Sequence, residues 1–211
     1  SQSVNALRGH LGEFGVIAPQ GISHADKLAR WVESAECTLP PSARDVCYVL
    51  IDQIRSLSEK IKKLDIDIRQ RAKRDDVAKR LMTIPGIGPI IAAAIEALAP
   101  APETFKRGRD FAAWMGLTPR QFSSGGKAKL GATSKMGQRD LRRLMIIGAS
   151  SVVRWASQKG PIPGTWLDQM LKRKPKMLVT MALANKMARI VWALMASGEV
   201  YKQNNSVLTA A

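Results

Sequence analysis

The chain has 211 residues, 45% of them hydrophobic and 24% charged, so it can bury a core and is not disordered throughout. Its 33 Lys and Arg residues outnumber the 17 Asp and Glu residues, and the resulting charge of +16 favours a polyanion such as nucleic acid as partner. The excess is uneven, because residues 1–80 carry 14 basic and 11 acidic side chains whereas residues 81–211 carry 19 and 6. We expect nucleic-acid contacts in the second part.

The cysteines and the hydropathy pattern exclude several other classes. Cys37 and Cys47 form no CxxC motif and have no histidine partners, which predicts a reducing compartment and no zinc knuckle. There is no signal peptide and no uncharged apolar run of about 18 residues, so we expect a cytoplasmic protein without a membrane partner. The chain starts without Met, inside what reads as a helix, and we expect it to be part of a longer protein.

The first 42 residues predict two short amphipathic helices and a linker. Apolar residues recur at helical spacing in 3–14 and again in 24–35. Ser42 follows two prolines and can cap the next helix. His10 and His24 stand alone, so we expect surface or packed histidines rather than metal ligands.

One long helix is predicted from Ala43 to Lys79. Its carboxylates are spread over several faces, which indicates a solvated surface rather than a catalytic cluster. We prefer a coiled-coil arm, residues 43–80, that dimerises with a second copy; packing against the N-terminal helices is the alternative. Mostly apolar residues step by threes and fours along this helix and form the seam: Val46, Leu50, Gln53, Leu57, Ile61, Leu64 and Ile68.

Residues 81–98 have the pattern of a helix-hairpin-helix. Gly86 and Gly88 allow a tight turn, and Ile87 between them can fill the hairpin. Pro89 suits the first turn of the second helix, whose free N–H groups can bind a phosphate oxygen. Such a contact positions DNA without reading its sequence. A hairpin that only packs is the alternative.

The remaining regular pattern is helical. We predict a short helix at 104–116 and a buried central helix at 177–197. No stretch alternates like a strand, so we predict an all-α fold: a long coiled-coil helix followed by a helical domain that contains the helix-hairpin-helix. A further amphipathic helix at 137–156 has the inner stripe Leu141, Leu144, Met145, Gly148, Val152 and Trp155.

Residues 120–143 combine two adjacent serines, a diglycine and seven basic side chains with one carboxylate, Asp140. The Ser-Ser-Gly-Gly run predicts a tight, exposed turn, which we expect to be mobile without nucleic acid because ordering glycine costs entropy. The turn can present the hydroxyl of Ser123 or Ser124 to a bulky substrate. A solvated loop without function is the alternative. The surrounding positive field comes from Arg120, Lys127, Lys129, Lys135, Arg139, Arg142 and Arg143.

A serine nucleophile needs activation, and the sequence limits where that activation comes from. No histidine follows His24, so a Ser-His-Asp triad is not available. The six acidic residues after position 80 are scattered, which argues against a two-metal site. The base or metal that activates the serine must then belong to another domain or subunit. We therefore expect the chain to be part of an enzyme.

Five ordered motifs resemble the C-terminal transposase domain of the DEDD-type insertion-sequence transposases, the family of RNA-guided bridge recombinases. Residues 43–79 resemble that family's coiled coil, and residues 1–36 resemble the helical segment after its catalytic domain. We therefore divide the chain into a linking segment 1–42, an arm 43–80, a transposase domain 81–201 and a polar tail 202–211. The motifs are Ile84–Gly88, Phe111–Pro119, Ser123–Gly126, Ser134–Gly137 and Leu141–Leu144.

The resemblance implies a mechanism. The family joins an N-terminal RuvC-like domain, with four acidic metal ligands, to this serine-bearing domain. The serine before glycine in the central loop attacks the DNA backbone and forms a phosphoserine link. That serine corresponds to Ser124, with Ser123 as the runner-up. The residues that would hold phosphate or stabilise charge are Arg120, Lys135, Arg142 and Arg143.

The resemblance also implies partners. The family acts in bacteria, binds DNA and a structured guide RNA, and forms dimers that assemble into tetramers on DNA. Because this chain lacks the RuvC-like domain, we expect Mg²⁺ in that missing domain and no cofactor here. We expect the chain alone to bind nucleic acid and self-associate without cleaving DNA.

Two other functions fit parts of the pattern. A helix-hairpin-helix DNA repair glycosylase or lyase would need a catalytic Lys or Asp after the hairpin, where this chain has Ala and Pro. A non-enzymatic architectural module would use the hairpin and the basic residues only to bind DNA. The substitution Ser124→Ala distinguishes a recombinase from the architectural module, because a recombinase would lose activity and keep DNA binding.

Overall fold

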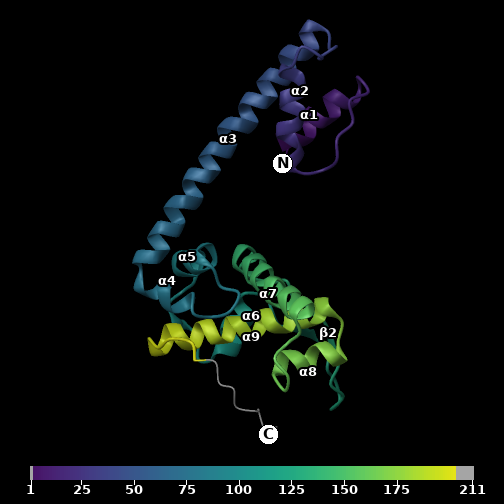
Figure 1. The fold of residues 1–211 in the computed structure, drawn as a ribbon. Coiled ribbons are helices and arrows are strands. Elements are labelled where there is room, and N and C mark those ends of the chain that lie inside the picture. Colours follow the sequence, from purple (N-terminus) through teal and green to yellow (C-terminus); the bar gives the residue numbers. More distant parts are fainter. Residues whose placement is uncertain (1, 203–211) are drawn as a thin grey trace. The chain divides into compact units, whose positions relative to one another are not determined.

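The computed structural model describes residues 2–202, which divide into two compact units, one up to Ile66 and one from Asp67 onward. Figure 1 follows the elements along the chain. Helices dominate the described residues, as predicted. The prediction that no strand occurs is wrong, because two short strands, β1 (Pro119–Gln121) and β2 (Leu130–Thr133), pair into a hairpin.

An apolar core holds the first unit together. It includes Leu7, Leu11 and Val32, all fully buried. The His10 Nε2 atom lies 3.1 Å from the carbonyl oxygen of Ala43, so this histidine is packed, as expected. The elements of the unit are α1 (Gln2–Gly12), the 3₁₀ turn η1 (Ile22–His24), α2 (Ala25–Glu33) and the first part of α3 (Pro41–Arg74).

The buried face of α3 differs from the predicted seam. Cys47, Ile51 and Ile54 belong to the core that α1 and α2 share, whereas Val46 and Gln53 of the predicted seam are exposed. Two neighbouring stripes of this helix are apolar, so spacing alone does not tell which one is covered. The N-terminal helices α1 and α2 cover the stripe of Cys47, Ile51 and Ile54, which is shifted by one residue from the predicted seam.

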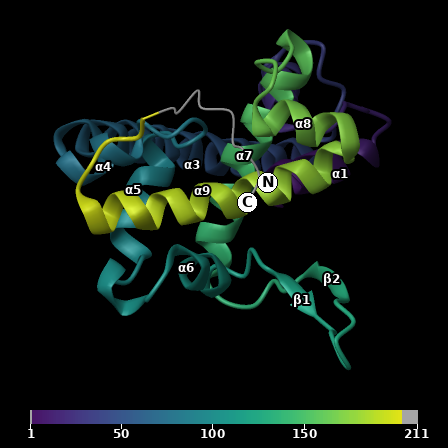
Figure 2. The same cartoon turned by 90° about the horizontal axis from the view of Figure 1, so that it is seen from below.

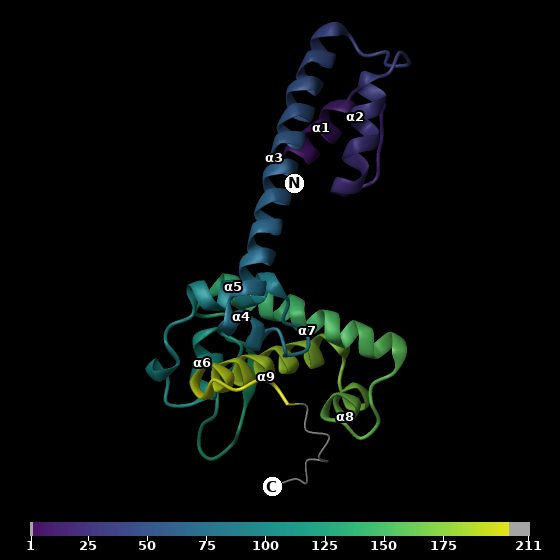
Figure 3. The same ribbon diagram turned by 60° about the vertical axis from the view of Figure 1, so that its left-hand side comes forward.

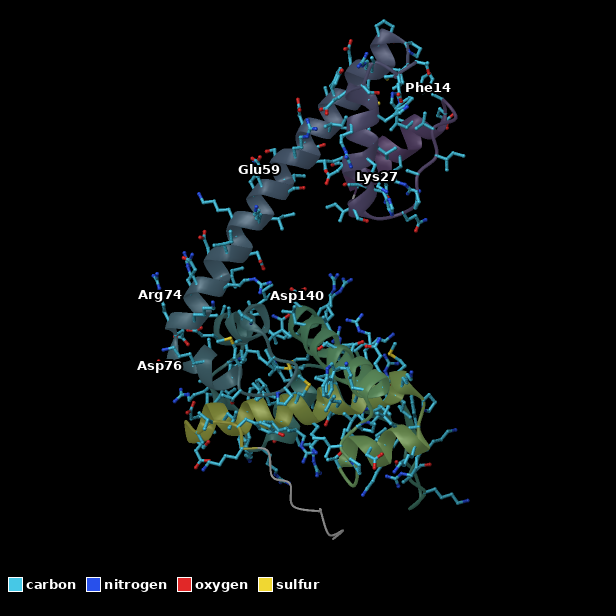
Figure 4. All side chains as sticks on the ribbon, in the orientation of Figure 1. Phe14, Lys27, Glu59, Arg74, Asp76 and Asp140 are labelled. Atoms are coloured by element: carbon cyan, nitrogen blue, oxygen red, sulfur yellow. The ribbon has the colours of Figure 1, made fainter. Side chains whose placement is uncertain are left out.

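Beyond Ile54 the apolar stripe of α3 lies open in the single chain. Leu57, Ile61 and Leu64 are 45%, 63% and 60% exposed. Charged side chains such as Glu59 project from the same stretch (Figure 4). Pairing of this stripe with a second copy stays a prediction.

The long helix also ends earlier than predicted, because Asp75 breaks it. Asp75 is extended (ψ 130°), and its carboxylate accepts the N–H of Ala78 at 2.6 Å. A new helix, α4 (Asp76–Leu81), starts from this N-cap. The Asp-Asp pair at 75 and 76 therefore marks the boundary between α3 and α4. The spacing of apolar residues continues across this boundary and does not reveal it.

The second unit is built around α9. Helices α4, α6, α7 and α8 all contact α9, and Figure 3 shows α7 and α9 side by side. Phe111, Met115 and Met145 are fully buried in the resulting core. The elements are α4, α5 (Pro89–Leu98), the 3₁₀ turn η2 (Pro102–Thr104), α6 (Gly108–Trp114), the hairpin, α7 (Arg139–Lys159), α8 (Trp166–Arg173) and α9 (Lys176–Ser197).

By length and composition, α9 is the one described helix that could cross a membrane. Its inner stripe, which includes Ala184, Ala188 and Val191, is fully buried against the other helices of the unit. Lys186 and Arg189 lie in the middle of the helix. These features are those of a core helix, and the prediction of a buried central helix at this place is confirmed.

The inner stripe predicted for α7 is correct in its first half and wrong at its end. Leu141, Met145 and Gly148 are buried, whereas Trp155 is 61% exposed. Val153 and Ala156 take the inward positions of the last turns. The phase shifts because the predicted positions advance slightly less than the 3.6-residue turn at each step and so drift around the helix over its length.

Candidate nucleic-acid interface

The predicted serine loop is a β-hairpin that projects from the helices of the second unit (Figure 2). Its strands pair Pro119 with Thr133 and Gln121 with Leu130, with an irregularity between the two pairs. The Phe122 N–H donates to the Lys129 carbonyl at 2.8 Å and continues the pairing toward the tip. The hairpin therefore extends away from the core.

The neck of the hairpin is closely packed. A Cβ atom on Gly116 would collide with the carbonyl oxygen of Met136, and one on Gly137 would collide with that of Trp114. Both glycines also have positive φ, of +71° and +95°. The Arg142 Nη1 atom donates to the carbonyls of Met115 and Met136, at 3.3 and 3.4 Å. The position of the hairpin is thus fixed by the end of α6 and the start of α7.

The tip is a tight turn from Ser124 to Lys127. The Lys127 N–H donates to the Ser124 carbonyl at 3.1 Å. Gly125 and Gly126 have φ of +57° and +77°, the signs that a type I′ hairpin turn needs at its two central residues. The prediction of a tight, exposed turn is confirmed. The two glycines occur here because the turn needs positive φ at both central residues.

The two serines differ in what their hydroxyls contact. The Ser123 Oγ atom accepts the Lys129 N–H at 3.0 Å and the Gln121 side-chain amide at 3.2 Å. No partner of the Ser124 Oγ atom occurs among the described residues, and the side chain is exposed. Ser123 closes the hairpin, and Ser124 presents a free hydroxyl beside the turn.

Six of the seven predicted basic residues are exposed around this hairpin. The six are Arg120, Lys127, Lys129, Lys135, Arg139 and Arg143. The carboxylate of Asp140 also lies exposed, in the first turn of α7 (Figure 4). Arg142 is half-buried in the neck, so the structure gives it a packing role beside any contact with phosphate.

Lys135 has an unusual backbone. Its φ is +56°, a conformation that no other non-glycine residue adopts in the described part of the chain. A lysine in this region costs about 1–2 kcal/mol, and such strain gathers at functional sites. Lys135 lies between β2 and α7, in the segment that returns the chain from the tip.

The helix-hairpin-helix forms as predicted, from α4, the turn 82–88 and α5. Gly86 has φ +90°, and a Cβ atom there would lie 2.7 Å from the carbonyl oxygen of Gly148 in α7. Ile87 is buried, and Gly88 caps α5 ahead of Pro89. Packing therefore accounts for Gly86 and Ile87, and the start of α5 remains the place where this motif could contact phosphate.

The structure does not join the two candidate surfaces into one cluster. The helix-hairpin-helix packs on the middle of α7 at Gly148, and the serine hairpin leaves from the start of α7 near Arg139. Nine residues of helix separate these points, or about 14 Å. The two surfaces are held by one rigid helix.

One charged residue of this unit was missed by the sequence reasoning. Asp168 is buried, with its carboxylate 2.9 Å from the Lys172 ammonium and 3.0 Å from the Gly164 N–H. These hydrogen bonds, Lys172 first, hold the pKa of Asp168 below its usual value. The signal was present in the spacing of Thr165 and Asp168, because the Thr165 hydroxyl caps α8 by accepting the Asp168 N–H.

Comparison with known proteins relates this chain to transposases. The family model described as "Transposase IS116/IS110/IS902 family" matches residues 78–161, which run from α4 past the end of α7. A putative transposase of Sinorhizobium fredii is 40% identical over 96% of this chain and 52% of its own length. A probable family 20 transposase of Pseudomonas aeruginosa is 41% identical over 94% of this chain and 59% of its own length.

A third relative carries the name of a mobile element. The transposase for insertion sequence element IS1328 of Yersinia enterocolitica is 34% identical over 96% of this chain and 60% of its own length. The chain thus spans between half and two thirds of the length of each of these three relatives. On these matches, the chain is similar over most of its length to insertion-sequence transposases, and over residues 78–161 to the IS116/IS110/IS902 family.

Proposed function

We propose that this chain is the DNA-handling part of an insertion-sequence transposase and that Ser124 is the nucleophile for DNA strand cleavage and exchange. The observation that carries the proposal is the hairpin tip. A type I′ turn places Ser124 at the end of the projecting hairpin, and its hydroxyl has no partner in the described chain. The Ser123 hydroxyl is already held by two hydrogen bonds, which favours Ser124 over its neighbour.

The reaction assigned to Ser124 is a phosphoryl transfer. Its Oγ atom would attack a backbone phosphorus, lose its proton to a base, and form a P–O bond as the bond to a deoxyribose oxygen breaks. That oxygen leaves with a proton, and the phosphate stays attached to the enzyme as a phosphoserine. Exchange would follow when the hydroxyl of another strand attacks the phosphoserine and releases Ser124.

The basic residues around the hairpin suit the charge that develops in this reaction. Phosphoryl transfer spreads negative charge over the phosphate oxygens, and positioned cations stabilise it. Arg120, Lys127 and Lys129 lie on the hairpin itself, and Lys135 lies in its return segment. The six acidic residues after position 80 do not gather here; Asp140 alone lies close in sequence.

The described residues do not fit a catalytic metal. No group of three or more His, Cys, Asp and Glu side chains that could hold an ion occurs within residues 2–202. We therefore derive no step through Mg²⁺ on this chain. We propose that the general base and the metal chemistry belong to a RuvC-like domain in the part of the relatives that this chain does not span.

The same proposal includes partners. We infer that the cytoplasmic, full-length protein binds a structured guide RNA and assembles as dimers that pair into tetramers on DNA. The open stripe of α3 supports self-association, because Leu57, Ile61 and Leu64 are exposed at a coiled-coil spacing.

The test is to trap the covalent intermediate. The full-length transposase is incubated with guide RNA, Mg²⁺ and a target duplex, then denatured, and the adduct is located by mass spectrometry. We expect DNA on Ser124, loss of the adduct in Ser124→Ala, and unchanged binding of target duplex by that variant. An adduct on Ser123, or Ser124→Ala retaining full activity, contradicts the assignment.

A second candidate is an architectural DNA-binding module without catalysis. The helix-hairpin-helix favours it, because the start of α5 offers backbone N–H groups to phosphate independently of the serine. Tight, salt-sensitive duplex binding with no adduct under any of these conditions would select this candidate.

A further inference from the structure

A cavity of about 1070 Å³ opens in the second unit, away from the residues of the serine hairpin. It lies between the end of α7, the loop 160–165 with α8, and α9, and it is also lined by Ile84 and Pro85 of the helix-hairpin-helix turn and by Tyr201. Its volume slightly exceeds the usual range for small-molecule sites, about 300–1,000 Å³. None of the residues assigned above to the hairpin, its neck or the start of α7 lines it.

Two tryptophans give the cavity a flat, aromatic lining. Trp155 comes from α7 and is 61% exposed, which is unusual for so large an apolar side chain. Trp166, the first residue of α8, is half-buried. Leu183 and Ile190 of α9 add aliphatic surface. An exposed tryptophan in a concave apolar site indicates a planar ligand that covers the ring.

The charged groups of the cavity are all cationic. Arg154 and Lys186 line it, and no Asp or Glu is among its described lining residues. The Lys186 Nζ atom lies 4.8 Å from the centre of the Trp166 ring, where a cation–π contact holds it. Burial, together with Arg189 nearby, lowers the pKa of Lys186. No carboxylate among the described lining residues balances its ammonium. An anionic ligand would supply the balancing charge.

From this combination we propose that the cavity binds unpaired nucleotides of a single-stranded nucleic acid. A base stacks on Trp155 or Trp166, and Arg154 and Lys186 contact the flanking phosphates. Stacking on aromatic side chains between cations is how proteins hold single strands, whereas duplex bases are already stacked and do not enter such a site. An apolar protein segment would use the aliphatic surface and leave the two cations without a partner.

The site is independent of the nucleophile. It would hold single-stranded DNA, or an unpaired stretch of RNA, while the hairpin and its basic residues engage the duplex. A failure of Ser124 as the nucleophile would leave this site untouched, and the reverse also holds.

The experiment measures binding of the 211-residue chain to three fluorescent probes: a short oligothymidylate, an oligouridylate of equal length, and a duplex. Trp155→Ala and Trp166→Ala are the test variants, with Lys186→Gln for the phosphate contact. Trp31→Phe, at a half-buried tryptophan of the first unit, is the matched control. Circular dichroism on each variant checks folding, and Trp155→Ala carries the least risk because its side chain is exposed.

We expect each tryptophan variant to weaken single-strand binding roughly tenfold, the scale of one lost base stack, and to leave duplex binding unchanged. A loss with oligothymidylate alone identifies DNA as the source, and a loss with oligouridylate alone identifies RNA. Oligonucleotides that carry bromouracil should crosslink to peptides that contain Trp155 or Trp166. Unchanged single-strand affinity, an equal loss on the duplex, or crosslinks confined to residues 119–133 overturns the proposal.

Discussion

The second unit contains two glycine-rich hairpins that use glycine for different reasons. In the helix-hairpin-helix, Gly86 has positive φ, and a Cβ atom on it would collide with the carbonyl oxygen of Gly148. Both the backbone conformation and the packing at this position therefore favour glycine. At the serine tip, Gly125 and Gly126 also have positive φ, but nothing lies within 4 Å of where a Cβ atom would be. The first hairpin is a packing surface, and the second is a turn in open space.

A Gly-rich motif in this basic sequence therefore has no single meaning. Buried glycines of this kind hold the fold together, and exposed ones shape what the fold presents. Substitutions at the two places should separate stability from function.

The largest expected effect is on stability at Gly86. Gly86→Ala adds backbone strain and a collision with the carbonyl of Gly148, and it should lower the free energy of unfolding by about 3 kcal/mol. Gly126→Ala is the matched control, since it has the same sign of φ without the collision and should cost about 1 kcal/mol. Urea unfolding followed by circular dichroism measures both, and equal losses would contradict the packing role of Gly86.

A smaller and purely electrostatic effect is expected at Arg143. Arg143→Gln should reduce the slope of log affinity for duplex DNA against log salt by about 1, because one phosphate contact is lost. Its thermal stability should not change, since Arg143 is exposed. The neighbouring Arg142→Gln should lower the melting temperature, because Arg142 donates to two carbonyls in the neck. If the two variants behave alike, the distinction between neck and surface is wrong.

The smallest effect is expected at Ser123. Ser123→Ala removes the acceptor of two hydrogen bonds that close the tip, so the yield of the covalent adduct in the full-length protein should fall roughly threefold. The adduct itself should remain on Ser124. Gln121→Ala removes one of these bonds and should have a weaker effect. Complete loss of the adduct in Ser123→Ala would point to Ser123 as the nucleophile instead.

The sequence predicted the features that depend on local spacing. The offsets of Gly86, Ile87 and Gly88 predicted the helix-hairpin-helix, and the Ser-Ser-Gly-Gly run predicted the exposed turn. The strands on either side were missed because each is only three or four residues long and Gly131 interrupts the second. Strands this short are stabilised by their pairing with each other across the turn, and the pattern of residues within one strand does not reveal that pairing.

The other misses concern which face of a helix is covered. Trp155 fitted an inner stripe by spacing, and the true stripe passes through Val153 and Ala156. On α3, Val46 and Cys47 are both apolar, and the N-terminal helices cover Cys47. Which side is buried depends on partners far away in the sequence. For the same reason the cavity at Trp155 and Trp166 could not be predicted, since segments far apart in the sequence form its walls.

The central place of α9 has a practical consequence for anyone who wants a minimal fragment of this protein. The family match ends at residue 161, before α9 begins, yet α9 supplies Ala184, Met187 and Val191 to the core that surrounds Phe111 and Met145. A fragment that ends where the match ends would lack α9 and expose the apolar side chains that α9 covers, so we expect it to aggregate. A soluble fragment for crystallisation or screening has to run through Ser197.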